Sequence, residues 1–461
     1  MKKFMTLALV FVMIFAVACA SDDGNQTATD APTEETTDAE ETTDAEETTD
    51  PAEPAETAEG IEAEISVAIE EPWTAYYEAV RERVLEANPD STINFITTGA
   101  FDHLDTIDAT NADNEDVADV FPYPLDRFYG LHQNEVLAAM DAEALASQIG
   151  GWDNFGEGFA KSLNADGEYF GMPMNIETLL VFVNKANAEQ YGIDITQPVE
   201  FTEIDQNALA TAIYNAWYGV AFTNPAELEL LAQTEEGFMS DMTKEWADLE
   251  PEKQATIEAL YNYFEAHKNT QMWDNEAVWG FIDEQAASGG SAAFVIEGPW
   301  NADKYMNQIM GEDGEVMALN NITINGKPLS HWKGGWAYGI NVRLEGDEDK
   351  KALAEAFIAE ALDPEYAVDF YKETGKIMEN STAATFESSD LDDMNKKVIA
   401  NVFEGFEQSV ERPLFNEWGQ VWTTFENGML SWNTVLPTNA EEAYNVLKDS
   451  FNAMMQQIGG Q

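Results

Sequence analysis

Apolar and polar positions alternate along the chain in patterns that predict a mixed α/β fold after residue 60. Ile61–Ile69 alternates with a period of two and is β-prone, which predicts a first strand. Trp73–Ala87 has apolar residues at helical spacing, and the Asn-Pro-Asp sequence that follows ends this predicted helix. Ile93–Thr97 predicts a second strand. A strand, a helix and a strand in this order are typical of the start of an α/β domain.

Later segments continue the same mixture. Strands are predicted over Asp119–Phe121, Leu179–Asn184, Ala292–Ile296 and Ala337–Val342, and helices over Gln254–His267, Asn275–Ala287, Asp349–Leu362 and from Asp393 onward. Phe170–Met174 and Leu179–Asn184 are expected to bracket a crossing segment. Strands mixed with long helices over about 400 residues predict two α/β lobes rather than one small domain.

The first 19 residues predict an export signal. Met1–Lys3 is short and basic, and Phe4–Ala18 is an apolar stretch too short for a typical membrane-spanning helix. Ala16–Cys19 is similar to a bacterial lipoprotein processing site and contains the only cysteine of the chain. We therefore expect residues 1–19 to be a lipoprotein signal peptide ending at a lipidated Cys19. The alternative is an ordinary signal peptide with a chance cysteine. A lipidated protein is anchored to a membrane rather than threaded through it.

Residues 20–60 have the composition of a disordered stalk. The sequence EETTDA occurs twice in succession from Glu34 and is then nearly repeated. The segment has 15 acidic residues, no Lys or Arg, and no apolar side chain larger than Ala. Such a segment cannot bury a core, and its like charges keep it extended.

The charge of the whole chain excludes one class of partner. It has 87 acidic residues against 22 Lys and Arg, a formal net charge of −65. A chain with this excess repels nucleic acid, so no nucleic-acid partner is expected.

Several kinds of chemistry find no support in the sequence. The four histidines lie far apart, which predicts no metal site. Neither a phosphate-binding Gly-rich loop nor a Gly-x-Ser-x-Gly nucleophile motif occurs. Carboxylates are so abundant that a glycosidase-like pair can be drawn anywhere and is uninformative. We therefore predict no cofactor and no enzymatic activity.

Six segments, in order, resemble the maltose/maltodextrin-binding proteins of ABC-type sugar importers. They are Val120–Leu137 (VFPYPLDRFYGLHQNEVL), Gly171–Lys185 (GMPMNIETLLVFVNK), Ala292–Trp300 (AAFVIEGPW), Gly334–Asn341 (GGWAYGIN), Ala354–Glu373, and Pro413–Phe425 (PLFNEWGQVWTTF). The resemblance implies an α/β, two-lobed periplasmic-binding-protein-like fold of type II, with a ligand cleft between lobes joined by hinge crossovers. The expected lobes are 61–175 plus 338–390, and 176–337 plus 391–461.

The resemblance also implies a function and partners. The protein would be the lipid-anchored, extracellular solute-binding component of an ABC importer, or a periplasmic one if there is an outer membrane. It would act as a monomer and close its lobes around a sugar, most closely maltose or maltodextrin. Permease subunits in the membrane and a separate ATPase would be its partners.

Sugar sites combine directional polar groups for the hydroxyls with aromatic rings for the C–H faces. By resemblance, the polar groups are Glu71, Asp126, Arg127 and Glu177, and the rings are Trp73, Tyr123, Trp300, Trp336 and Trp422. For Asp126 and Arg127 the alternative is a surface ion pair, and for the tryptophans it is a place in the core. Pro72 stands where well-known members have a lysine, and Tyr123 where they have a tryptophan.

Two other functions stay open at this point. Acids and aromatic rings also suit a receptor for a polyamine or another cationic solute, although Arg127 beside Asp126 argues against it. A surface protein that binds or hydrolyses carbohydrate without transport is the second alternative.

Overall fold

The computed structural model describes residues 60–235 and 237–459. The predicted signal peptide, the lipid-anchor residue Cys19 and nearly all of the predicted stalk lie outside these residues. Within the described part, no helix combines the length and the apolar character needed to cross a membrane.

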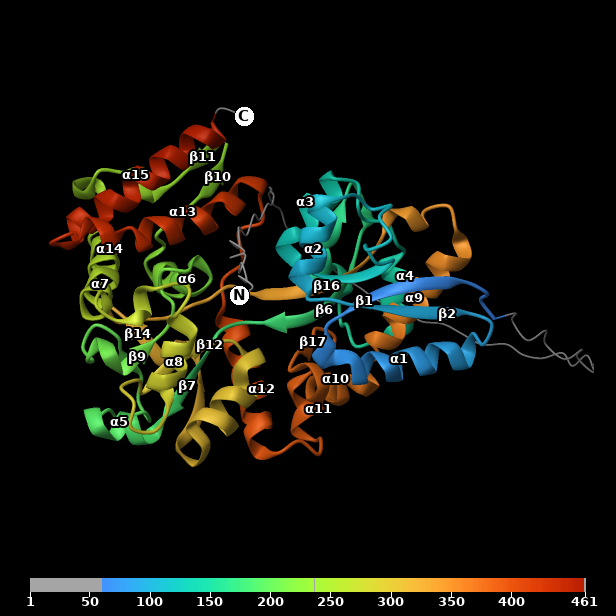
Figure 1. The fold of residues 1–461 in the computed structure, drawn as a ribbon, viewed down its shortest axis with the longest axis horizontal. Helices are drawn as coiled ribbons and strands as arrows, with labels where there is room; N and C mark the ends of the chain where they lie inside the picture. Colours follow the sequence, from blue (N-terminus) through green and yellow to red (C-terminus); the bar gives the residue numbers. More distant parts are fainter. Residues whose placement is uncertain (1–59, 236, 460–461) are drawn as a thin grey trace, which may run out of the picture.

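A six-stranded sheet forms the centre of the first lobe, which lies on the right in Figure 1. Its order is β17 (Ile377–Met378), β6 (Met172–Glu177), β16 (Gly334–Ile340), β3 (Val120–Pro124), β1 (Glu64–Ile69) and β2 (Thr92–Thr97). β1 pairs with β2 and β3 in parallel, whereas β16 is antiparallel to both of its neighbours. Buried apolar residues cover both faces of this sheet, as expected for a central sheet in an α/β lobe.

Helices cover the two faces of this sheet. In Figure 1, α1 (Thr74–Ala87) and α10 (Ala367–Thr374) lie below it, and α2 (Ala100–Ala109) and α3 (Phe128–Gln133) lie above it. The other helices of this lobe are α4 (Ala142–Ile149), α9 (Glu348–Ala361) and α11 (Ala383–Glu387), and a short ribbon joins β4 (Asn164–Ala165) to β5 (Glu168–Tyr169).

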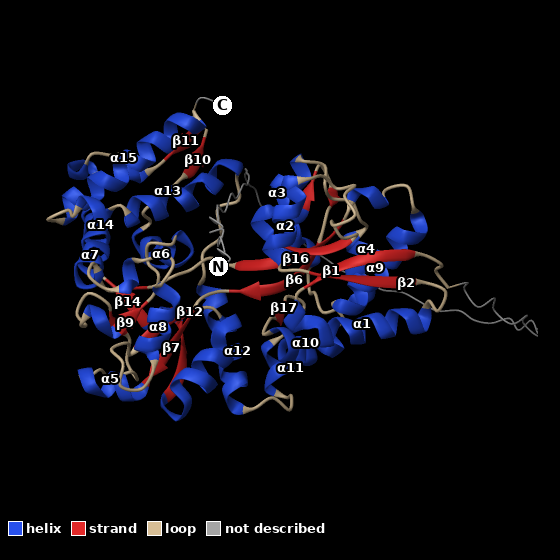
Figure 2. Ribbon diagram, in the orientation of Figure 1, coloured by secondary structure: helices blue, strands red, loops and turns tan. Residues whose placement is uncertain are grey.

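The second lobe has a smaller sheet and more helices (Figure 2). The four strands are ordered β13 (Gly314–Ala318), β7 (Leu180–Asn184), β12 (Phe294–Glu297) and β9 (Leu209–Ala210). The longer helices of this lobe are α5 (Lys185–Tyr191), α6 (Ala216–Thr223), α7 (Pro251–His267), α8 (Val278–Ala286), α12 (Asp393–Gln408), α13 (Gly419–Leu430) and α15 (Ala440–Ile458). The short elements are α14 (Trp432–Val435), β8 (Val199–Glu200), β10 (Ala232–Thr234), β11 (Gly237–Met239), β14 (Ile322–Ile324) and β15 (Lys327–Pro328).

The chain passes between the lobes at the ends of β6 and β16, and again between α11 and α12. These two strands pair as far as Glu177 and Gly334, so both belong to the first sheet over their full length. β7, which belongs to the second sheet, begins at Leu180. The first sheet thus continues two residues past the predicted boundary at 175, and β16 enters it four residues before the predicted boundary at 338.

Candidate functional site

Asp126 lies at the end of β3, in the short helical turn Leu125–Arg127, and reaches across to the second lobe. Nη2 of Arg412 is 2.9 Å from its Oδ2, and both side chains are less than a tenth exposed. Apart from Arg412, neither carboxylate oxygen has a side-chain hydrogen-bond partner among the described residues. Burial raises the pKa of Asp126, while the positive charge of Arg412 opposes that rise. This carboxylate therefore has lone pairs left for a ligand.

Three tryptophans of the second lobe surround the Arg412 guanidinium. Its Cζ is 5.3 Å from the ring centroids of Trp217, Trp332 and Trp422 alike. We call these three rings the tryptophan cage. Trp217 lies on α6 and Trp422 on α13, whereas Trp332 precedes β16. A guanidinium at this distance from indole faces is held by cation–π attraction.

A second cation lies among aromatic rings on the first-lobe side. Lys376, just before β17, places Nζ 2.6 Å from Oε1 of Glu177 at the end of β6. The same Nζ is 4.8 Å from the ring centroid of Trp336 and 5.5 Å from that of Trp73. Asn175 donates a further hydrogen bond of 3.2 Å to Glu177. Lys376 thus supplies a basic group near the first loop, where Pro72 offers none.

The two clusters lie within electrostatic reach of each other. Burial is the largest influence on the pKa of each group: it raises that of Asp126 and lowers that of Arg412. The negative charge of Glu177 also reaches both groups and acts to raise both pKa values. Together the clusters contain two carboxylates and two cations, so their formal charge cancels. Carboxylates and cations beside indole rings are the groups that sugar hydroxyls and sugar C–H faces require.

Trp300 extends the aromatic surface toward solvent. It follows the Gly298–Pro299 turn after β12, and 38% of its surface is exposed. Its ring centroid is 6.4 Å from that of Trp217. A Cβ on Gly298 would lie only 2.1 Å from this ring, so glycine is needed for the ring to pack over the turn. Trp300 is therefore the most accessible ring of the group.

Two predicted residues have surroundings other than those expected. Arg127 pairs with Asp108 at 2.7 Å, and its charge also reaches Asp126, where it opposes the rise in pKa caused by burial. Tyr123 is fully buried, and its hydroxyl donates to the carbonyl of Phe170 at 3.2 Å. All five residues of β3 are buried, so the Tyr123 ring has no face open for stacking on a ligand.

Glu71 is exposed on the first turn after β1. Burial raises the pKa of its neighbour Glu70, and the positive charge of Lys376 opposes that rise. Two of the predicted residues, Asp126 and Trp422, contact Arg412. Three others, Glu177, Trp73 and Trp336, lie around Lys376. Trp300 flanks Trp217.

Sequence reasoning missed Trp217, Trp332, Lys376 and Arg412. Trp217 and Trp332 lie in apolar or irregular segments where a tryptophan is most simply interpreted as core. The one available signal was Arg412 itself, a cation followed by proline in a very acidic chain.

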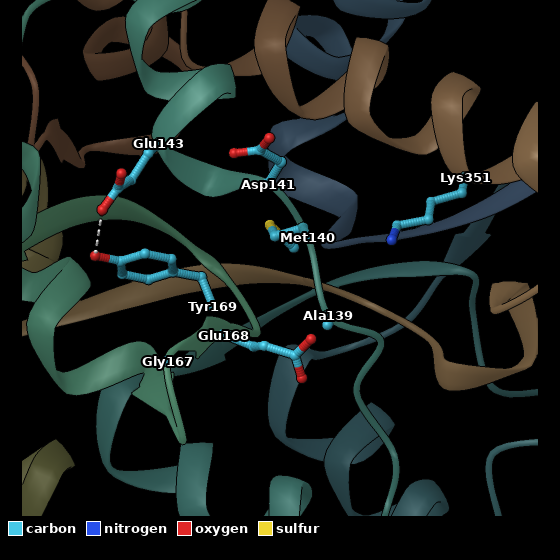
Figure 3. Close-up of a pocket in the computed structure, with 8 residues that line it drawn as sticks. All are labelled: Ala139, Met140, Asp141, Glu143, Gly167, Glu168, Tyr169 and Lys351. Carbon is cyan, nitrogen blue, oxygen red and sulfur yellow. Dashed lines mark hydrogen bonds between the residues drawn. The ribbon is translucent and has the colours of Figure 1, made fainter.

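A separate surface hollow of about 420 Å³ lies on the first lobe (Figure 3). It is lined by Asp141, Glu143, Glu168, Tyr169 and Lys351, together with Ala139, Met140 and Gly167. The hydroxyl of Tyr169 donates to Glu143 at 3.2 Å. The hollow shares no residue with the two clusters and has no tryptophan in its lining. The described residues also contain no group of three or more His, Cys, Asp or Glu side chains placed to hold a metal ion.

Glu297, at the end of β12, predicts a pH-dependent stability. Burial raises its pKa to about 7, although it accepts hydrogen bonds of 2.8 Å from Tyr218 and from the Gly298 amide. A carboxyl with a raised pKa binds a proton more tightly in the folded state than in the unfolded state. Its contribution to the stability of the folded protein is therefore complete below about pH 4.5 and is lost as pH rises through about 7. In Glu297→Gln the melting temperature should therefore fall less between pH 4.5 and 7 than in the wild type. The pH-dependent changes in the free energy of unfolding of the two proteins should differ by about 3 kcal/mol at most. Parallel melting curves for the two proteins would contradict this assignment.

The sheets, the crossings and the cluster between the lobes define the two-lobed fold of solute-binding proteins. Among solved structures, the chain is similar to the maltose-binding protein MalE of Listeria monocytogenes in complex with maltose, with a TM-score of 0.63 and 18% identity over 86% of this chain and 99% of the other. It is equally similar in fold to MalX of Streptococcus pneumoniae with maltopentaose, with a TM-score of 0.63 and 20% identity over 84% and 99%.

Sequence comparison finds relatives of the same kind. The chain is 23% identical over 398 residues to the maltodextrin-binding protein MdxE of Bacillus subtilis, covering 84% of this chain and 89% of that protein. It is 22% identical over 404 residues to the maltooligosaccharide ABC transporter solute-binding lipoprotein of Streptococcus pneumoniae, covering 84% and 88%. No protein-family model matches the chain. The resemblance and the fold predicted from the sequence are confirmed.

Proposed function

We propose that this protein is the sugar receptor of an ABC-type importer and that it binds malto-oligosaccharides. One observation carries the proposal. The Arg412 guanidinium joins Asp126 of the first lobe to Trp217 and Trp422 of the second, and the exposed ring of Trp300 lies beside Trp217. Relatives in sequence and fold are named for maltodextrin or maltose binding.

The charges of the site favour a neutral ligand over the cationic alternative. Arg412 and Lys376 already lie beside the rings on which an ammonium group would bind, and each repels a second cation. Neutral hydroxyls can accept from Lys376 and donate to Asp126 and Glu177. Ligand contacts to both lobes would favour the closed form.

The proposal extends to location and partners. The receptor is a monomer that is held at the extracellular face of the membrane through lipidated Cys19, and it delivers its ligand to permease subunits driven by a separate ATPase. We assign it no catalytic role, because its relatives are named as binding proteins.

Removing the accessible ring tests the function. Trp300→Ala should weaken malto-oligosaccharide binding about tenfold, because the stacking surface is lost while little buried area changes. Binding is measured by the shift in melting temperature with maltose, maltotriose and longer maltodextrins, since a ligand at a hundredfold excess over its Kd adds about 2.7 kcal/mol of stability.

Trp279→Ala is the matched control, because Trp279 is also 38% exposed but packs on Tyr218, on the second lobe. It should bind like the wild type. A wild-type shift with spermidine and with none of the sugars would reject the proposal. Release of shorter sugars from maltoheptaose would instead favour the hydrolytic alternative.

A further inference from the structure

Arg412 occupies the position between the lobes where a ligand would bind. Its guanidinium is equidistant from the three rings of the tryptophan cage and contacts Asp126 on the opposite lobe. The planar guanidinium stacks on indole faces and forms directional bonds to carboxylates. These are the surfaces that a sugar ring would use for stacking and for its hydroxyls.

Backbone hydrogen bonds hold the segment just before Arg412. Val410 donates to the carbonyl of His331 and accepts from the amide of Lys333, both at 2.9 Å. Pro413 follows Arg412 and holds the residue before it in an extended conformation. Arg412 is therefore tied to the segment through which the chain returns to the first lobe at β16.

We propose that Arg412 is an affinity-determining residue that acts as an internal competitor. In the ligand-free protein its ion pair with Asp126 holds the lobes together and covers the tryptophan cage. A sugar binds there only after the guanidinium has left the rings. The inference rests on the proposed function for the identity of the ligand, but the interlobe contact can be tested without any ligand.

Arg412→Gln tests the competition. Gln lacks the charge and the planar cation, so Asp126 and the cage become accessible. The Kd for maltotriose, measured by calorimetry on the full-length protein, should fall about tenfold, which corresponds to about 1.4 kcal/mol. Without ligand, the radius of gyration from small-angle X-ray scattering should increase, because the interlobe ion pair is gone. Arg412→Lys keeps the charge without the planar group and should lie between the two.

Arg83→Gln is the matched control. Arg83 also combines an ion pair, to Glu360 at 2.8 Å, with a ring, that of Tyr366 at 3.7 Å, but within the first lobe. It should change neither the Kd nor the radius of gyration. A Kd for Arg412→Gln that is unchanged or higher than that of the wild type would overturn the inference, as would an unchanged radius of gyration. If the wild type binds no malto-oligosaccharide, the proposed function fails, and the scattering comparison alone decides whether Arg412 holds the lobes.

Discussion

Lys376→Met is expected to lower the free energy of unfolding by about 3–5 kcal/mol. The reason is that Glu177 would remain buried without the ammonium group 2.6 Å away. Both side chains are no more than a tenth exposed, so solvent screens their interaction little. Urea unfolding followed by far-UV circular dichroism measures this loss.

Two further variants separate the buried ion pair from other effects of the substitution. The double variant Lys376→Met/Glu177→Gln should recover most of the lost stability, because neither charge then stays buried alone. Lys372→Met removes a cation from the same region, but its partner Asp390 is 80% exposed and solvent screens the pair, so the stability should hardly change. A similar loss for Lys372→Met and Lys376→Met would contradict the explanation.

Asp126→Asn should weaken malto-oligosaccharide binding about tenfold. Loss of charged hydrogen bonds from a buried carboxylate to hydroxyls costs up to about 3 kcal/mol, or roughly a hundredfold in Kd. If Arg412 competes with the sugar, breaking its ion pair with Asp126 should improve binding about tenfold. The loss of the Asp126 carboxylate as an acceptor is the larger effect, so the Kd should still rise. Titration calorimetry with maltotriose gives the value directly.

Asp108→Asn is the control for this substitution. Asp108 pairs with Arg127 at 2.7 Å but is 45% exposed, and it should leave the Kd unchanged. Combining Asp126→Asn with Arg412→Gln should recover less than the tenfold that Arg412→Gln gives alone, because the ion pair is already broken and only the tryptophan cage remains to be uncovered. Tighter binding by Asp126→Asn than by the wild type would show that the carboxylate serves only to hold Arg412.

Periodicity predicted the elements of the fold well because their local signals are strong. The predicted strand Leu179–Asn184 is found as Leu180–Asn184, and the predicted helix Asp349–Leu362 as Glu348–Ala361. The helix expected at Gln254 instead begins at Pro251, since proline is favoured at the first helical position. Strand β16 begins earlier than predicted because Gly334–Gly335 carries no apolar signal, although both glycines pair with β6.

The site was less predictable because its key contacts join residues far apart in the sequence. Asp126 and Arg412 are 286 positions apart, and Glu177 and Lys376 are 199 apart. Resemblance could suggest Asp126 and Glu177, but no local pattern indicates which cation each one meets. Tyr123 shows the opposite problem. A tyrosine is suited to stacking on a sugar, but here Gly171 and Gly339 pack so closely against the Tyr123 side chain that a Cβ at either position would clash with it. This packing joins segments that are far apart in the sequence, so no local pattern indicates it.

The strand order of the first sheet also limits how the chain can mature during synthesis. β16, in the interior of that sheet, is contributed by Gly334–Ile340, long after β1, β2, β3 and β6 have been made. Until that segment leaves the ribosome, β3 and β6 lack the neighbour between them, and their buried residues have no complete sheet to enter. The first lobe therefore completes its fold after most of the second lobe has been translated. If residues 1–19 act as the predicted export signal, the chain meets the export machinery while its first lobe is still incomplete.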